Sequence, residues 1–217
     1  MHKYVFNELQ NYVYLYMGKI ITIAHQKGGV GKSTLALNLA ICFQDQLTVA
    51  LVDTDLQGSI ADLKEDLPEL SIIQEDNFEA IRNLPDQLII IDTPPYLSNR
   101  LPELFLISDY VLIPTKAGFF DVMAIRSTVA LVREAQSKHP ELKAGIVLNM
   151  IKHRSGVTAE VQELLKNFEV PLLATVVHDR VSFTRSPITG GVLNGEDGKA
   201  KEEITALAEE IVNSVSV

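Results

Sequence analysis

The segment from Ile20 to Phe43 places a β-branched run, a glycine-rich turn and a helical repeat directly after one another. The run Ile20–Ala24 has the length and continuous apolarity of a strand that is buried on both faces. Leu35, Leu39 and Phe43 recur at the i, i+4, i+8 spacing of a helix. A strand that enters a helix through glycines directs backbone N–H groups and the helix N-terminus at one point. The segment therefore predicts a phosphate-binding loop in an α/β fold.

The side chains of this turn suit a nucleoside triphosphate with a magnesium ion. Lys32 can reach the β- and γ-phosphates, and the Ser33 hydroxyl can ligate Mg²⁺. The backbone can approach the phosphates closely because of three glycines, Gly28, Gly29 and Gly31. The common pattern GxxxxGK[ST] would place its first glycine at position 26, where this chain has Gln26. The loop is therefore a variant, and it contains a second lysine, Lys27.

Further β-branched runs alternate with helical patterns along the rest of the chain. The other expected strands cover Thr48–Val52, Leu88–Ile91, Tyr110–Pro114, Gly145–Leu148 and Leu172–Val177. This alternation predicts an α/β fold with a mostly parallel, twisted sheet flanked by helices on both faces. In a chain of 217 residues without a break in composition, we expect one domain over residues 19–217. Residues 1–18 are interpreted as an N-terminal extension, with a start codon read too early or an aromatic membrane-seeking helix as alternatives.

Three aspartates follow predicted strands, at the edge where ligands bind in open α/β sheets. Asp53 and Asp55 form a DxD pair, and Asp92 follows four apolar residues. These positions place carboxylates near the predicted phosphate loop. The alternative is ordinary turn chemistry, in which a strand-end aspartate accepts backbone hydrogen bonds.

Three segments together resemble one family of ATPases. KGGVGKST (27–34) is similar to the deviant Walker A box of the ParA/MinD family, ALVDTDLQGS (50–59) to its first switch, and LIIIDTPP (88–95) to its Walker B strand and second switch. The resemblance covers Lys19 to the C-terminus and is strongest to the short, single-domain, ParF-like ParA proteins. It implies a P-loop NTPase fold with a deviant Walker A loop, and ATP and Mg²⁺ as cofactors.

The resemblance also implies a role for each motif residue. The nucleotide would be bound by Lys27, Gly28, Gly29, Val30, Gly31, Lys32, Ser33 and Thr34. Lys27 would be the signature lysine that reaches across a dimer interface to the other subunit's nucleotide, and Asp55 would orient the attacking water. The residues near Mg²⁺ would be Ser33, Asp53 and Asp92. Asn149, in GIVLNM, would meet the adenine edge; the alternative is a buried asparagine that is satisfied by the backbone.

The implied activity is slow, partner-stimulated ATP hydrolysis by a partition or positioning ATPase. ATP binding would join two subunits into a homodimer, the dimer would bind nonspecific DNA, and a ParB-like or other small cargo-adaptor protein would stimulate hydrolysis. The cargo would be a plasmid, a chromosome region or a protein compartment. We expect a cytoplasmic, nucleoid-associated protein without a stable membrane anchor, because the longest apolar runs fall far below the roughly 20 residues that cross a bilayer.

Other members of this fold differ at specific positions. The single cysteine, Cys42, is expected on the core face of the first helix, which argues against an iron–sulfur site. The C-terminal segment EEITALAEEIVNSVSV is acidic, whereas MinD-like proteins end in a basic amphipathic helix. Two alternatives are retained: a membrane-associated MinD-like positioning ATPase, and an ATP-dependent ligase of the dethiobiotin synthetase type. The ligase would have no reason to keep Lys27.

Nonspecific DNA binding requires a local basic surface, because the formal net charge of the chain is −9. Residues 138–201 contain nine Lys and Arg against seven Asp and Glu, whereas residues 202–217 contain four Glu and no Lys or Arg. The candidate phosphate contacts are Lys152, Arg154, Lys166, Arg180, Arg185, Lys199 and Lys201. The alternative for each of them is a solvated surface charge.

Overall fold

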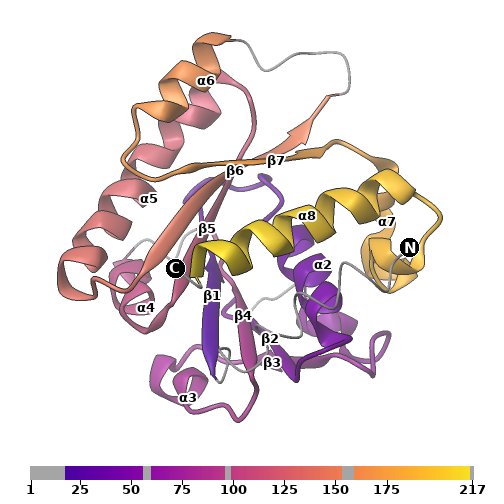
Figure 1. Ribbon diagram of the computed structural model, residues 1–217. Helices are drawn as coiled ribbons and strands as arrows, with labels where there is room; N and C mark the ends of the chain where they lie inside the picture. The colour runs from indigo at the N-terminus through magenta and orange to yellow at the C-terminus, as the bar shows by residue number, and fades with distance from the viewer. Residues whose placement is uncertain (1–17, 56–59, 96–98, 153–158, 216–217) are drawn as a thin grey trace.

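The computed structural model describes residues 18–55, 60–95, 99–152 and 159–215, and these residues form a seven-stranded sheet in which every pair of neighbouring strands is parallel (Figure 1). The strand order is β3-β2-β4-β1-β5-β6-β7. The strands are β1 (Lys19–Ile23), β2 (Val49–Asp53), β3 (Ser71–Gln74), β4 (Leu88–Asp92), β5 (Tyr110–Thr115), β6 (Lys143–Ile151) and β7 (Leu172–His178). The α/β fold is confirmed, and both ends of every expected strand lie within three residues of their predicted positions.

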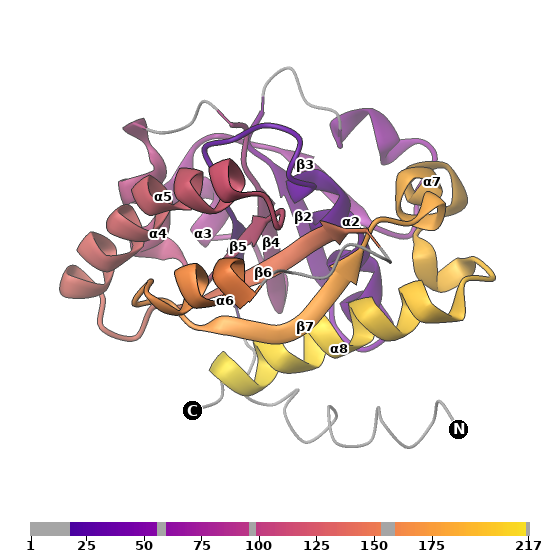
Figure 2. The same cartoon turned by 90° about the horizontal axis from the view of Figure 1, so that it is seen from above.

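Helices cover both faces of this sheet (Figure 2). Within the described residues the helices are α2 (Lys32–Gln44), α3 (Phe78–Arg82), α4 (Leu101–Ile107), α5 (Phe119–Lys138), α6 (Ala159–Lys166), α7 (Val181–Thr189) and α8 (Gly198–Val215). Two short 3₁₀ turns lie at Ala61–Lys64 and Val192–Asn194. No helix in the described ranges is long and apolar enough to cross a membrane.

The strand side chains alternate between two cores, as the two-residue period of a strand requires. Leu88 and Ile90 of β4 belong to the core that also contains residues of α2, α7 and α8, whereas Ile89 and Ile91 belong to the core that contains residues of α3, α4, α5 and α6. Cys42 is buried in the first of these cores. Because both faces are covered, the central strands are almost entirely apolar between their ends, and this makes them recognisable in the sequence.

Strand register brings the predicted motifs to one edge of the sheet. β1 lies between β4 and β5, with Ile23 beside Asp92, and Asp53 of β2 also lies beside Asp92. The loop that joins β1 to α2 therefore starts next to the ends of β2 and β4. This is the carboxyl edge of the strands, where open α/β sheets bind ligands.

Candidate functional site

The loop between β1 and α2 has the backbone of a phosphate-binding turn. Gly29 and Gly31 adopt left-handed conformations, with φ of 69° and 88°, and Gly31 is the N-cap of α2. A Cβ on Gly31 would also collide with the side-chain amide of Asn149. The first turn of α2 contains no acidic residue. The loop thus presents an open helix N-terminus, which favours an anion.

Lys32 is buried in this loop, with an exposed fraction of 6%. Its Nζ donates to the backbone carbonyl oxygen of Lys27 at 3.3 Å. Burial lowers the pKa of Lys32, and the nearby Asp92 carboxylate acts in the opposite direction. An ammonium group that is removed from water, with one neutral acceptor, favours the arrival of an anion.

The hydroxyl of Ser33, in the first turn of α2, meets the carboxylate of Asp92 at the end of β4. Ser33 Oγ donates to Asp92 Oδ2 at 2.6 Å, and the buried Asp92 Oδ1 has no hydrogen-bond partner within the described residues. Burial, with a smaller contribution from Asp53, raises the pKa of Asp92 from 3.8 to about 7. A buried carboxylate oxygen without a partner, beside a hydroxyl, fits a divalent cation. Within the described ranges no group of three or more His, Cys, Asp or Glu side chains could hold a metal ion.

The Asp53 carboxylate accepts hydrogen bonds from the backbone of the chain that follows β2. Its Oδ1 accepts from Asp55 N at 2.9 Å, and its Oδ2 accepts from Ile60 N and Ala61 N at 3.2 and 3.3 Å. Both carboxylate oxygens are therefore engaged by backbone, as in the turn-chemistry alternative, although Asp53 lies beside Asp92. The backbone carbonyl of Asp55 accepts from Gln74 Nε2 at 3.0 Å. The structure thus fixes the backbone of Asp55 at the start of the segment 56–59, which lies outside the described residues.

The ionisation of Asp92 predicts a pH-dependent stability. A carboxyl group whose pKa is raised in the folded state stabilises that state while protonated, and the stabilisation is lost as pH rises through about 7. Each pKa unit corresponds to about 1.4 kcal/mol. We expect Asp92→Asn to raise the melting temperature of the nucleotide-free, magnesium-free protein at pH 8, and to change it little at pH 4. An exposed control, Asp66→Asn, should show no such pH dependence; an unchanged melting temperature for Asp92→Asn at pH 8 would contradict the prediction.

Besides the hydrogen bond that its carbonyl oxygen accepts from Lys32, Lys27 makes two further contacts within the same chain. Its Nζ forms an ion pair with Asp121 in the first turn of α5, and its backbone N–H donates to His25 Nδ1 at 2.7 Å. Burial, together with Lys32 and Lys27, lowers the pKa of His25 to about 4, so the imidazole is neutral near pH 7 and can accept this bond. His25 and Asp121 lie outside the motifs that predicted the site. The contact of Lys27 with a second subunit stays a prediction.

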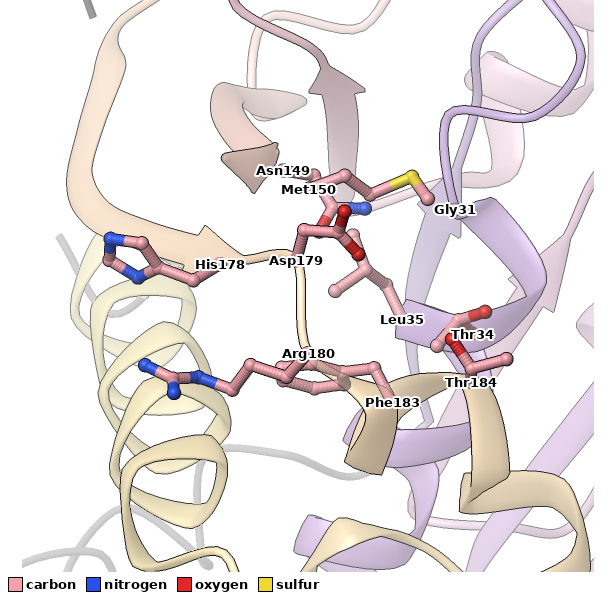
Figure 3. A pocket seen from close by; sticks show the side chains of 10 residues that line it. All are labelled: Gly31, Thr34, Leu35, Asn149, Met150, His178, Asp179, Arg180, Phe183 and Thr184. Atoms are coloured by element: carbon pink, nitrogen blue, oxygen red, sulfur yellow. The ribbon is translucent and has the colours of Figure 1, made fainter. Parts of the chain in front are cut away.

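A small pocket lies beside the first turn of α2, between the end of β6 and the β7–α7 connection (Figure 3). Asn149 lines it and is 4% exposed, and its Nδ2 donates to Val30 O at 2.8 Å. Asn149 of β6 therefore forms a hydrogen bond with the backbone of the glycine loop. This is the arrangement expected of a buried asparagine that is satisfied by the backbone. Because Asn149 also lines the pocket, its contact with the adenine edge stays a proposal.

The basic candidates differ in their surroundings. Lys152, Lys166, Arg185 and Lys199 are exposed and Lys201 is partly exposed, and Lys166 pairs with Glu163 at 3.4 Å. Arg180 is different, because its guanidinium binds Glu203 at 2.6 Å and its side chain is only 13% exposed. We therefore remove Arg180 from the candidate DNA contacts. Arg154 lies outside the described residues.

Comparisons with known proteins agree with this geometry. Residues 21–193 match the model of the CobQ/CobB/MinD/ParA nucleotide-binding domain. The chain is 28% identical over 209 residues to maintenance of carboxysome distribution protein A of Halothiobacillus neapolitanus, covering 89% of this chain and 96% of that protein. It is 28% identical over 252 residues to the chromosome partitioning protein ParA of Myxococcus xanthus, covering 90% and 88%. A plasmid partition protein of Borrelia burgdorferi bound to AMPPNP has the same fold, with a TM-score of 0.72 at 23% identity, covering 90% and 98%.

Proposed function

The chain belongs to the CobQ/CobB/MinD/ParA family of nucleotide-binding domains, and from this we propose that it is a partition or positioning ATPase that hydrolyses ATP with Mg²⁺. The observation on which the proposal rests is the buried Lys32 in an open glycine loop, next to the Ser33–Asp92 pair. Its relatives of similar length include partition and carboxysome-distribution proteins, and this favours a positioning role over a biosynthetic one.

The chain supplies a group for each part of the phosphate chemistry. Backbone N–H groups of residues 28–34 and the Lys32 ammonium would bind the β- and γ-phosphates. Ser33 and Asp92 would hold Mg²⁺, which neutralises charge on the phosphate oxygens when bound. Asp55 would orient the attacking water, since its backbone is fixed by Asp53 and Gln74.

The cycle that we propose has two further elements. In an ATP-bound homodimer, Lys27 of each subunit would reach the nucleotide of the other, as an arginine finger does. That dimer would bind nonspecific DNA on the nucleoid, and a ParB-like or other small cargo-adaptor protein would stimulate hydrolysis and release it. The described basic residues that would face DNA are Lys152, Lys166, Arg185, Lys199 and Lys201.

A DNA-binding assay tests this cycle. Asp55→Ala with ATP should give a long-lived dimer, because the attacking water loses its positioning group while the phosphate contacts remain. We expect that dimer to bind random-sequence DNA, whereas the protein with ADP or without nucleotide should not. The affinity should fall with salt at a log–log slope of about −0.9 per phosphate neutralised.

Substitution of basic residues by alanine tests which surface binds DNA. Arg185→Ala combined with Lys199→Ala and Lys201→Ala should flatten the salt slope without loss of ATP-dependent dimerisation. The matched control is Lys64→Ala combined with Arg82→Ala and Arg126→Ala, three exposed cations outside residues 138–201. Equal DNA binding in all nucleotide states, or none with ATP at low salt, would rule out the nucleoid cycle. Vesicle sedimentation would then test the membrane-associated alternative.

A further inference from the structure

The connection between β3 and α3, residues 74–78, contacts two segments that leave the carboxyl edge of the sheet. At its start, Gln74 Nε2 donates to the backbone carbonyl oxygen of Asp55 at 3.0 Å, in the chain that follows β2. Further along, Asp76 accepts two hydrogen bonds from Arg100, the N-cap residue of α4, which is the α-helix that follows β4. The β3–α3 connection therefore bridges the segments that follow β2 and β4, the two strands at whose ends the aspartates of the proposed site lie.

Arg100 holds this connection through three interactions. Its Nη1 donates to Asp76 Oδ2 at 3.2 Å, and its Nη2 donates to the Asp76 carbonyl oxygen at 2.6 Å. Its guanidinium carbon also lies 4.3 Å from the centre of the ring of Phe78, the first residue of α3. Because Phe78 is buried in the core, its ring offers a fixed face to the cation. A planar guanidinium can engage a carboxylate, a carbonyl and an aromatic ring together, and a lysine cannot reproduce this geometry.

Hydrogen bonds within the connection make it a rigid piece. Glu75 N donates to Asp53 O at 3.2 Å, and Glu75 Oε1 accepts from the backbone N–H groups of Asp76 and Asn77, both at 2.9 Å. Asn77 Oδ1 in turn accepts from two backbone N–H groups in the first turn of α3. Because these residues bind one another, a displacement at Asp76 would be passed on to Gln74.

The pair formed by Arg100 and Asp76 is too exposed to add much to the free energy of unfolding. Their side chains are 35% and 45% exposed, and water screens an ion pair of this kind. The contacts do fix where the N-terminus of α4 lies relative to the backbone of Asp55. A group that orients a reacting water needs such fixing, because small displacements lower the rate steeply.

We propose that Arg100 is a positioning residue for ATP hydrolysis. By holding Asp76 it fixes the β3–α3 connection, and Gln74 of that connection fixes the backbone of Asp55. The inference rests on the proposed function, because it takes Asp55 as the residue that orients the attacking water. Phosphate binding at the glycine loop around Lys32 does not depend on these contacts, so ATP affinity and the rate of hydrolysis should respond differently.

Single-turnover hydrolysis of ATP, measured separately from ATP affinity, tests this role. Gln74→Leu removes the amide donor and keeps the size of the side chain, whereas Arg100→Ala removes all three interactions. Each should slow hydrolysis by roughly tenfold or more, since a misplacement of about 1 Å can cost a hundredfold. The dissociation constant of ATP should change by less than about twofold, because only the chemical step loses a contact. Arg100→Lys, which keeps the charge without the planar fork, should recover only part of the rate.

A double variant tests whether the two residues act through the same connection. If Arg100 and Gln74 act in series on Asp55, the combination of Gln74→Leu with Arg100→Ala should be about as slow as the slower single variant. Two independent effects would multiply instead, and a multiplied effect would overturn the inference.

Two control variants separate positioning from stability. Ile81→Val removes a buried methyl group from α3, so it should lower the melting temperature and keep the wild-type rate. Arg133→Ala breaks an exposed ion pair between α5 and Glu169 and should also keep the wild-type rate. A rate that follows the melting temperature in every variant, Ile81→Val included, would reduce Arg100 to a structural residue and overturn the inference.

Asp55→Ala distinguishes a failure of this inference from a failure of the proposed function. Wild-type rates in Gln74→Leu and Arg100→Ala, together with a slow Asp55→Ala, would overturn the positioning role alone. A wild-type rate in Asp55→Ala would overturn the role of Asp55 and the inference with it. Absence of ATP hydrolysis in the wild-type protein would overturn the proposed function itself.

Discussion

Replacing Lys32 with alanine should abolish ATP binding while leaving the folded chain intact. Lys32 is the buried cation of the glycine loop, and within the described residues its Nζ donates one hydrogen bond, a 3.3 Å contact with the carbonyl oxygen of Lys27. Burial lowers its pKa, so the fold gains little from holding this charge without an anion. The phosphates would lose their principal cation inside a water-poor site, where charge pairing is strong. We expect a loss of affinity of at least roughly a hundredfold, as for charged hydrogen bonds.

Thermal unfolding with and without Mg-ATP separates binding from stability. Wild-type protein should gain stability with ATP, by about 2.7 kcal/mol at 100 times the dissociation constant. Lys32→Ala should unfold at or above the wild-type temperature without nucleotide and should show no gain with ATP. Lys32→Met, which keeps the aliphatic stem, should behave in the same way, and Lys64→Ala should retain the full gain. An ATP-induced gain in either Lys32 variant would show that the triphosphate does not occupy this loop.

The fold was predictable because its central strands are almost entirely apolar between their ends. β1, β2, β4 and β5 are covered on both faces, and between their ends only the buried Thr22 of β1 interrupts the apolar runs. β3 was missed because this edge strand has two apolar residues between Ser71 and Gln74, and both of these polar ends are exposed. β6 is longer than expected because its flanking residues pair through backbone, which side-chain polarity does not report. Lys143, for example, pairs with Tyr110.

The candidate site was predictable only where its residues are consecutive. The glycine loop and the strand-end aspartates form local motifs whose spacing follows from phosphate and metal chemistry. The partners of those residues come from distant segments: Asp121 is 94 positions from Lys27, and Glu203 is 23 positions from Arg180. The sequence therefore indicated the positive charge of Arg180 but not its ion pair with Glu203. The positive φ of Met150, 57°, accompanies the irregular pairing of β6 with β7, which leaves no sequence pattern.

Lys27→Ala should affect subunit association rather than nucleotide affinity. In the single chain, the Lys27 ammonium pairs with Asp121 and its backbone is held by His25, so it makes no described contact with the aspartates at the ends of β2 and β4. A lysine that acts on a second subunit must leave Asp121. We expect Lys27→Ala to bind ATP within a few-fold of wild type, to lose ATP-dependent dimers, and to lose partner-stimulated hydrolysis by roughly a thousandfold, as when an arginine finger is removed.

Asp121→Asn supplies the matched variant, because it releases Lys27 without removing it. The pair is partly exposed, with side-chain exposed fractions of 43% and 19%, so its loss should favour dimerisation by a factor of about two to five. Light scattering across an ATP titration should thus move in opposite directions for the two variants. Asp62→Asn, an exposed aspartate between β2 and β3, should match wild type. Wild-type dimerisation and turnover in Lys27→Ala would assign Lys27 to its ion pair with Asp121 alone. A shift of both variants in the same direction would mean that the pair itself supports the dimer.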